Sequence, residues 1–158
     1  MENLFPVIRN AVRAVIIKDK RVLLLRKDGG SRGERFALPG GAQDTGETLE
    51  IALQRECLEE IGTEVQIEAL VYVADYFKER DTTPPSHKHL VEFLFRCRVP
   101  KGYIPATGHH PDKHQVAVVW KPLSELDSIE LYPRSIISCL QNLQAPPGGA
   151  AAYLGLID

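Results

Sequence analysis

Residues 41–63 read GAQDTGETLEIALQRECLEEIGT and contain the strongest helix signal in the chain. On a helical wheel of about 100° per residue, the apolar side chains of this stretch fall on one stripe. The stripe consists of Leu49, Ala52, Leu53, Cys57 and Ile61. Asp44 and Glu47 have the spacing of a capping box, and Gly62 stands where a C′ glycine ends a helix. We therefore expect a helix over residues 47–61 that packs its apolar stripe on a sheet.

Three carboxylates border that stripe in the second half of the helix. Glu56 and Glu60 are four residues apart, and Glu59 lies on the adjacent edge. Like charges at this spacing destabilise a helix by roughly 0.2–0.5 kcal/mol, and anions in the last turns oppose the helix dipole. Arg55 can pair with Glu59 or with Glu47, but one guanidinium does not neutralise three carboxylates. Clustered carboxylate oxygens suit Mg²⁺ or Mn²⁺, and a solvated charged face is the alternative.

The chain on either side of this helix carries mostly strand patterns. Runs rich in β-branched and aromatic residues predict strands at 11–17, 21–26, 64–77, 89–99 and 115–120, and a short apolar run at 36–38 stops at Pro39. A helical turn is predicted at 123–126 and a helix at 133–143. The Pro-, Gly- and Ala-rich tail 145–158 is expected to be an irregular arm that docks through Tyr153 and Leu154. With no internal repeat and no linker, residues 1–158 are expected to form a single α/β or α+β sandwich domain.

Composition excludes several classes of protein. Lys and Arg total 19 and Asp and Glu total 21, for a net charge of −2. This balance argues against a partner such as a nucleic-acid duplex or an anionic membrane surface. The sequence predicts no transmembrane helix and no secretory signal. The three cysteines have no CxxC spacing, which favours reduced thiols and a cytoplasmic location.

The fixed positions of residues 41–63 resemble the Nudix box, Gly-x5-Glu-x7-Arg-Glu-U-x-Glu-Glu-x-Gly-U, where U is aliphatic. All seven specified identities are present, at Gly41, Glu47, Arg55, Glu56, Glu59, Glu60 and Gly62. The two U positions hold Cys57 and Thr63, and Thr63 departs from the pattern. The preceding Leu-Pro-Gly-Gly of residues 38–41 also resembles the usual lead-in of the family. The resemblance implies an α/β/α sandwich with a mixed β-sheet, in which the box forms a loop-helix-loop.

The same resemblance implies an activity. Nudix proteins are mostly Mg²⁺-dependent hydrolases of nucleoside diphosphates linked to a further group, and Mn²⁺ is a second candidate ion. By resemblance, Glu56, Glu59 and Glu60 are expected to bind the metal together with the Gly41 carbonyl. Glu47 and Arg55 are expected to orient these ligands. The catalytic residues expected within the box are therefore Glu47, Arg55, Glu56 and Glu59. The reaction is attack of water on phosphorus in a small-molecule, nucleoside diphosphate-type substrate.

The general base could lie outside the box. Strand alternation places Glu92 on the same face as Leu90 and Leu94, as a carboxylate among apolar side chains. Glu79 and Asp81, in the polar segment after the preceding strand, are weaker candidates.

Substrate contacts are expected from the loops around the box. Arg26 and Arg35, with Lys27 and Arg32 nearby, could hold phosphate oxygens. Tyr76 is a candidate for stacking a base, as are the aromatic residues Phe36, Tyr72 and Trp120. Gln115, with Asp112, ends a His-containing loop at 107–115 that could recognise a base or act as a lid. The spacing of the five histidines disfavours a zinc site.

The substrate is the least determined part of this interpretation. The proline that marks the ADP-ribose branch about fifteen residues beyond the Nudix box is absent, since Pro84 and Pro85 come later. A MutT-like pyrophosphohydrolase that clears nucleoside triphosphates from the nucleotide pool is therefore the default by elimination. Two alternatives are a non-catalytic nucleotide sensor and a relative of isopentenyl diphosphate isomerase, whose catalytic cysteine matches neither Cys97 nor Cys139. Exchange of the tail between copies would give a homodimer.

Overall fold

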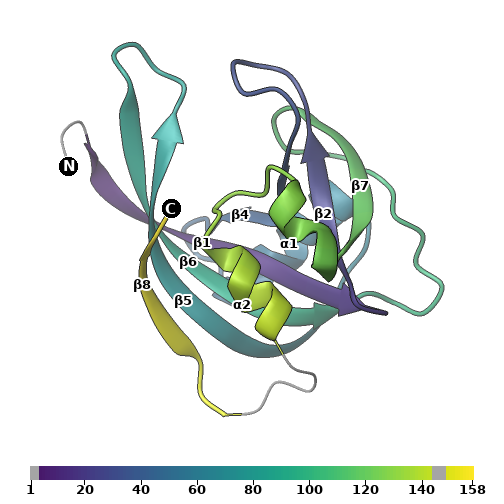
Figure 1. Cartoon of the computed structure of the whole chain (residues 1–158). Helices are drawn as coiled ribbons and strands as arrows, with labels where there is room; N and C mark the ends of the chain where they lie inside the picture. Colours follow the sequence, from purple (N-terminus) through teal and green to yellow (C-terminus); the bar gives the residue numbers. More distant parts are fainter. Residues whose placement is uncertain (1–3, 144–148) are drawn as a thin grey trace.

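A mixed eight-stranded sheet forms the centre of the molecule in the computed structural model, which describes residues 4–143 and 149–158 (Figure 1). The main path of the sheet runs β3-β2-β1-β6-β5-β8, with β4 paired to β1 and β7 paired to β2. The strands are β1 (Leu4–Lys18), β2 (Arg21–Lys27), β3 (Arg35–Ala37), β4 (Gly40–Ala42), β5 (Gln66–Arg80), β6 (Ser86–Arg98), β7 (Gln115–Pro122) and β8 (Ala152–Ile157). Strand β1 runs parallel to β6, whereas β5 and β6 form a long antiparallel hairpin.

The helices cover opposite faces of this sheet, each over its own hydrophobic cluster. Helix α1 (Leu49–Ile61) packs Ala52, Leu53, Cys57 and Ile61 against alternate side chains of β1, β2 and β6. Helix α2 (Ile136–Asn142) and the 3₁₀ helix η1 (Leu123–Ser128) pack against side chains that point the other way. The predicted sandwich with a mixed sheet is therefore confirmed.

The predicted strands are all present, and several are longer than their patterns suggest. Strand β1 begins at Leu4 because the first residues pair with the far end of the β5–β6 hairpin. Strand β4 was not predicted, since its Gly-Gly-Ala sequence has no strand signal and its pairing comes from β1. The helix predicted at 133–143 is shorter and begins at Ile136.

The tail differs most from its prediction. Residues 145–148 of the expected arm lie outside the described residues, but Ala152–Ile157 form β8, parallel to β5, so an irregular arm is wrong there. Leu154 packs against the core on the α2 side, while Tyr153 donates a hydrogen bond to Asp75. Backbone pairing with β5 imposes strand structure that the Ala- and Gly-rich sequence alone does not favour.

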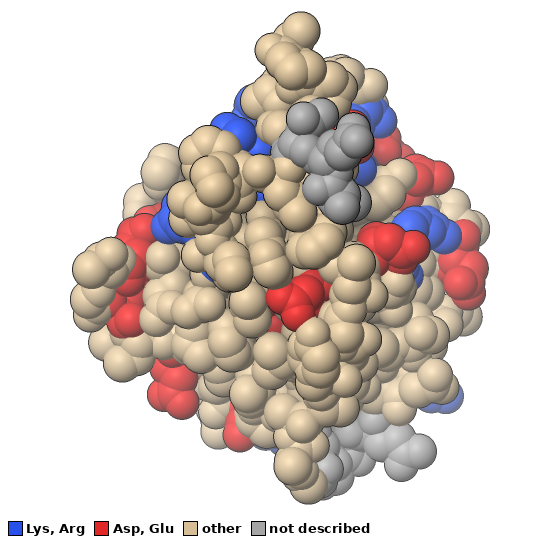
Figure 2. Space-filling view, turned by 90° about the vertical axis from the view of Figure 1, so that its left-hand side faces the viewer, with Lys and Arg blue, Asp and Glu red and all other residues tan. Residues whose placement is uncertain are grey.

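The surface agrees with the balanced charge of the chain. Figure 2 looks onto the side that carries the β5–β6 hairpin and β8, where uncharged side chains cover most of the face. Acidic residues are scattered over it, and the visible Lys and Arg side chains lie mainly towards its upper part. None of the helices among the described residues is long and apolar enough to span a membrane.

Candidate active site

The loop before α1 is fixed by the carboxylate of Glu47. Glu47 accepts a hydrogen bond from the backbone N–H of Asp44 (2.8 Å), as the predicted capping box requires. The helix itself begins two residues later than predicted, because Thr48 is its N-cap and accepts a hydrogen bond from the Ile51 N–H (3.1 Å). At the other end Gly62 takes the left-handed conformation (φ 72°), as expected.

Arg55 ties the loop to the helix. Its guanidinium makes two hydrogen bonds to Glu47 (2.7 and 2.9 Å) and one to the Ala42 carbonyl (3.0 Å). The hydrogen bonds from Arg55, and then that from the Asp44 N–H, lower the pKa of Glu47 to about 2. Arg55 also reaches Glu56 (3.0 Å) and Glu59 (3.4 Å) on its own helix. The Arg55 guanidinium therefore positions Glu47, Glu56 and Glu59, but it does not reach Glu60.

Glu60 is a buried carboxylate, with only 2% of its surface exposed. Its Oε1 accepts a hydrogen bond from the Gly40 N–H (2.7 Å). Burial, followed by repulsion from Asp112, raises the pKa of Glu60 to about 8. Burial also raises the pKa of Glu56, despite the contact with Arg55. The negative charge on this helix edge is thus incompletely compensated by the protein.

The same residues provide a suitable set of ligands for a hard divalent cation. Within residues 4–143 and 149–158, no three His, Cys, Asp or Glu side chains converge into a preassembled metal site. However, Gly41 leaves space beside Glu56: a Cβ at position 41 would lie 2.5 Å from Glu56 Oε1. Carboxylate and carbonyl oxygens are preferred by Mg²⁺ and Mn²⁺. A cation here would also lower the cost of ionising the partly buried Glu56 and the buried Glu60.

The C-terminal end of α1 is held by the loop between β6 and β7. The N–H groups of Gly108 and His110 donate to the carbonyls of Glu60 (3.1 Å) and Glu59 (3.0 Å). Gln115 also donates to the Glu60 carbonyl (2.8 Å), and the Tyr103 hydroxyl donates to that of Ile61 (2.6 Å). The side-chain amide of Gln115, expected to contact substrate, is thus engaged with backbone groups that fix the acidic helix.

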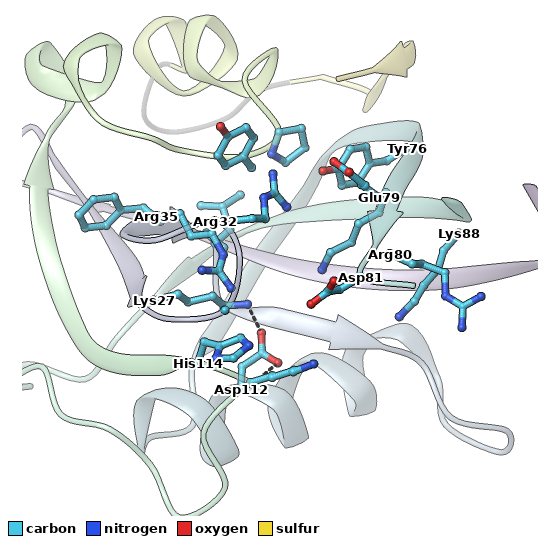
Figure 3. A pocket seen from close by; sticks show the side chains of 18 of the residues that line it. Lys27, Arg32, Arg35, Tyr76, Glu79, Arg80, Asp81, Lys88, Asp112 and His114 are labelled. Atoms are coloured by element: carbon cyan, nitrogen blue, oxygen red, sulfur yellow. Dashed lines mark hydrogen bonds and ion pairs between the residues drawn. The ribbon is translucent and has the colours of Figure 1, made fainter. Parts of the chain in front are cut away.

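A cavity of about 520 Å³ opens on the face of the sheet opposite α1, and Figure 3 shows its walls. Arg32 comes from the loop that leads into β3, Arg35 is the first residue of β3, and Tyr76 and Glu79 come from β5. Asp112 forms an ion pair with Lys27, the last residue of β2. Burial would raise the pKa of Asp112, but Lys27 holds it below its usual range. Eight Lys or Arg side chains and four carboxylates line the cavity, so its charge is positive on balance.

Arg13 connects this cavity to the Nudix-like segment, and the sequence analysis missed it. Its Nε donates to Glu92 Oε2 (2.9 Å), and its Nη1 donates to the Gly40 carbonyl (2.8 Å). Gly40 in turn donates to Glu60, so a chain of contacts runs from the cavity wall to the acidic helix. A single arginine between Val12 and Ala14, in an apolar strand, was the available signal.

The other expected site residues are divided between the cavity and other parts of the fold. Glu92, only 2% exposed, lines the cavity in its pair with Arg13, and Glu79 and Asp81 lie nearer the hairpin end. Tyr76 and Arg35 also line the cavity, and Arg35 donates to the carbonyls of Gly29 and Gly33. Arg26 is outside this lining and pairs with Glu34 (3.3 Å).

Of the remaining aromatic and basic candidates, Phe36, Lys27 and Arg32 line the cavity. Tyr72 and Trp120 pack against the two hydrophobic clusters.

Comparison with known proteins identifies relatives of this arrangement. Residues 7–138 match the model of the NUDIX domain. The ADP-ribose pyrophosphatase of Methanocaldococcus jannaschii is 34% identical over 84 residues, which cover 53% of this chain and 48% of that protein. The chain thus spans about half the length of this relative.

Solved structures extend the similarity to the fold. A NUDIX hydrolase from Nitrosomonas europaea superposes with a TM-score of 0.67 at 21% identity, over 85% of this chain and 87% of the other. A MutT NUDIX hydrolase from Burkholderia pseudomallei has a TM-score of 0.64 at 26% identity, over 87% and 99%. Because the domain match covers most of its length, the chain belongs to the NUDIX domain family.

Proposed function

We propose that this protein is a pyrophosphohydrolase that depends on a divalent cation and cleaves the diphosphate of a nucleoside diphosphate derivative, with ADP-ribose as the first candidate substrate. One observation carries the proposal: an acidic helix edge and a cationic cavity meet at Gly40, joined through Glu60 and Arg13. A substrate diphosphate is anionic, and it requires both a cation at the carboxylates and positive charge around its remaining oxygens.

Glu56, Glu59, Glu60 and the Gly41 carbonyl are the residues proposed to hold Mg²⁺ or Mn²⁺. Such an ion, when bound, neutralises diphosphate charge and lowers the pKa of coordinated water. Arg55 keeps Glu56 and Glu59 in place, and its bond to the Ala42 carbonyl fixes the segment next to Gly41. These contacts limit the rearrangement needed when the cation binds.

Glu92 and Arg13 are proposed to position the segment before the helix. Both Glu92 oxygens face Arg13 (2.9 and 3.4 Å), and Arg13 holds the Gly40 carbonyl. A role for Glu92 as general base would require it to accept a proton while it pairs with Arg13. Arg35 and Tyr76 are proposed to contact the substrate from opposite walls of the cavity.

The choice of ADP-ribose rests on the relative from M. jannaschii. A nucleoside triphosphate, the substrate expected from the MutT-like resemblance, is the second candidate, and a MutT NUDIX hydrolase from B. pseudomallei is 26% identical over nearly its whole length. The two predict different products. ADP-ribose and water give AMP and ribose 5-phosphate, whereas a nucleoside triphosphate and water give a monophosphate and pyrophosphate.

A substrate panel tests the proposal. ADP-ribose, other nucleoside diphosphate sugars and the eight common nucleoside and deoxynucleoside triphosphates are incubated with Mg²⁺, with Mn²⁺ and with EDTA, and the products are separated by chromatography. We expect cleavage that requires the cation, with the largest kcat/KM for ADP-ribose. A larger kcat/KM for a triphosphate would favour the second candidate. Binding without turnover across the panel would instead support a nucleotide sensor and contradict the proposal.

A further inference from the structure

The positive charges of the cavity differ in whether the protein balances them. Arg13 is paired with Glu92, and Lys27 with Asp112. Arg35 is hydrogen-bonded to two carbonyls, and Arg32 lies over the ring of Tyr132, 4.5 Å from its centroid. These four cations therefore have partners within the protein.

Lys78 also lines the cavity, but it has no such partner. It lies on β5 two residues after Tyr76 and is partly buried. Among the described residues its side-chain ammonium forms neither a hydrogen bond nor an ion pair. The nearby charges are Arg13 on β1, Lys27 on β2, Glu92 on β6 and Asp112 in the loop before β7.

The surroundings of Lys78 disfavour its charge. Burial, followed by repulsion from Arg13 and Lys27, lowers the pKa of Lys78 to about 8, although Asp112 and Glu92 act in the opposite direction. The two carboxylates already face other cations, so they compensate Lys78 only in part. An anion in the cavity would supply the missing compensation.

Lys78 is linked to the acidic helix through the charge of Arg13, which lines the same cavity. Arg13, one of the charges that acts on Lys78, holds the Gly40 carbonyl, and the Gly40 N–H holds Glu60. An extended anion that begins at a cation bound to the acidic helix would therefore enter the cavity past Arg13, whose charge acts on Lys78. A phosphoryl group fits this position, since a lysine ammonium can donate to several of its oxygens without a fixed geometry.

We propose that Lys78 binds the diphosphate group of the substrate from within the cavity and sets the affinity for it. This inference rests on the proposed function for the identity of the ligand, but not for its anionic character. Lys78 acts on binding rather than on proton transfer, so it contributes to KM and not to kcat.

The matched control is Lys88, which pairs with Lys78 in the β5–β6 register and also lines the cavity. Lys88 is exposed at the rim, where solvent screens its charge. Lys78→Met removes the charge but keeps a side chain of similar length, Lys78→Arg retains the charge, and Lys88→Met tests the surface position. Thermal unfolding of each variant confirms that it is folded before any binding is compared.

Two measurements test the role of Lys78. The first is KM and kcat for ADP-ribose with Mg²⁺. The second is calorimetric binding of inorganic pyrophosphate in EDTA, which needs neither turnover nor a divalent cation. For Lys78→Met we expect KM to rise and pyrophosphate affinity to fall, each by about tenfold to a hundredfold, with kcat within about twofold of wild type. Lys78→Arg should recover most of the affinity, and Lys88→Met should change it by less than about threefold.

Other outcomes overturn the inference. Unchanged KM and pyrophosphate affinity in Lys78→Met would remove Lys78 from the binding site. A loss of kcat with unchanged KM would assign it to proton transfer instead. If the wild type cleaves nothing in the panel but binds pyrophosphate through Lys78, the proposed function fails while this inference holds.

Discussion

The edge of α1 and the cavity on the opposite face of the sheet are complementary in charge and differ in construction. On α1, Glu56, Glu59 and Glu60 lie within five consecutive residues, and Arg55 pairs with Glu56 and Glu59 but not with Glu60. The cavity instead gathers its eight cations from β1, β2, β3, β5, β6 and two loops, and two of them, Arg13 and Lys27, are paired with carboxylates. The first region lacks a cation and the second lacks an anion.

This difference suits the two regions to the separate roles proposed for them, metal binding on α1 and substrate recognition in the cavity. Carboxylates on one rigid helix keep fixed spacings, which suits the coordination of a metal ion. Cations on separate strands can surround a larger ligand, which suits recognition of a nucleotide. Arg13 and Gly40 connect the two, so substitutions on either side should separate effects on folding, catalysis and binding.

The largest expected effect is on stability, from Glu92→Gln in the cavity wall. This change leaves the partly buried Arg13 without its counterion, which should destabilise the fold by about 3–5 kcal/mol. Urea unfolding at neutral pH measures it. The matched control is Glu68→Gln, which breaks the pair with the exposed Arg98 and should change stability by only about 0–1 kcal/mol. Equal losses in the two variants would contradict the structural role assigned to the Arg13–Glu92 pair.

On the helix edge, Glu59→Gln should affect catalysis and leave the fold intact. Loss of one charged group that acts on the transition state lowers kcat by about 10²–10³-fold. Glu59 is partly exposed, so the unfolding midpoint should change little. Glu50→Gln, in the exposed first turn of the same helix, is the control and should retain activity. Wild-type turnover by Glu59→Gln would remove this carboxylate from the proposed mechanism.

Substitution of two glycines should also separate an effect on stability from an effect on metal binding, with smaller changes in each. In Gly108→Ala, the new Cβ would lie 2.4 Å from the carbonyl oxygens of Leu58 and Glu59, so the loop should move from the helix end and stability should fall by about 1–3 kcal/mol. In Gly41→Ala the Cβ would meet the end of the flexible Glu56 side chain, which can turn away. We therefore expect Gly41→Ala to lower Mg²⁺ affinity in a titration of activity, with little change in thermal unfolding. The opposite pattern would contradict the placement of the metal beside Gly41.

The smallest expected effect is the pH dependence of anion binding in the cavity. The pKa of Lys78 is lowered to about 8, so its charge is present below pH 8 and is lost as the pH rises above it. Pyrophosphate affinity, measured in EDTA, should therefore fall by up to about tenfold between pH 7 and pH 9. The same titration of Lys78→Met corrects for ionisation of pyrophosphate itself. Parallel curves for the two proteins would show that Lys78 does not cause the decrease.

The sequence predicted the helix edge well because all its determinants are local. The stripe from Ala52 to Ile61 has helical periodicity. Asp44 and Glu47 specify the turn before the helix, and Gly62 specifies its C-terminus. Only the start of the helix was displaced, since Thr48 competes successfully with Asp44 for the cap. Local patterns also located most strands, but not β4 or β8, whose Gly- and Ala-rich sequences become strands through pairing with β1 and β5.

The cavity was much less accessible to prediction. Its residues are brought together by strand register, which no short pattern encodes. Arg13 and Lys78 appear unremarkable in sequence, and their role depends on Glu92, Lys27 and Asp112 from distant segments. Arg26 and Arg35, nearby in sequence, differ in that only Arg35 lines the cavity.

The rate of ADP-ribose hydrolysis as a function of free Mg²⁺ tests the central claim most directly. We predict no AMP release in EDTA, a saturable rise with Mg²⁺, and a curve for Glu59→Gln that stays at least about a hundredfold lower at saturation. A rate that is independent of the cation, or the absence of hydrolysis with both Mg²⁺ and Mn²⁺ for every nucleotide tested, would contradict the claim that the acidic helix and the cationic cavity form one hydrolytic site.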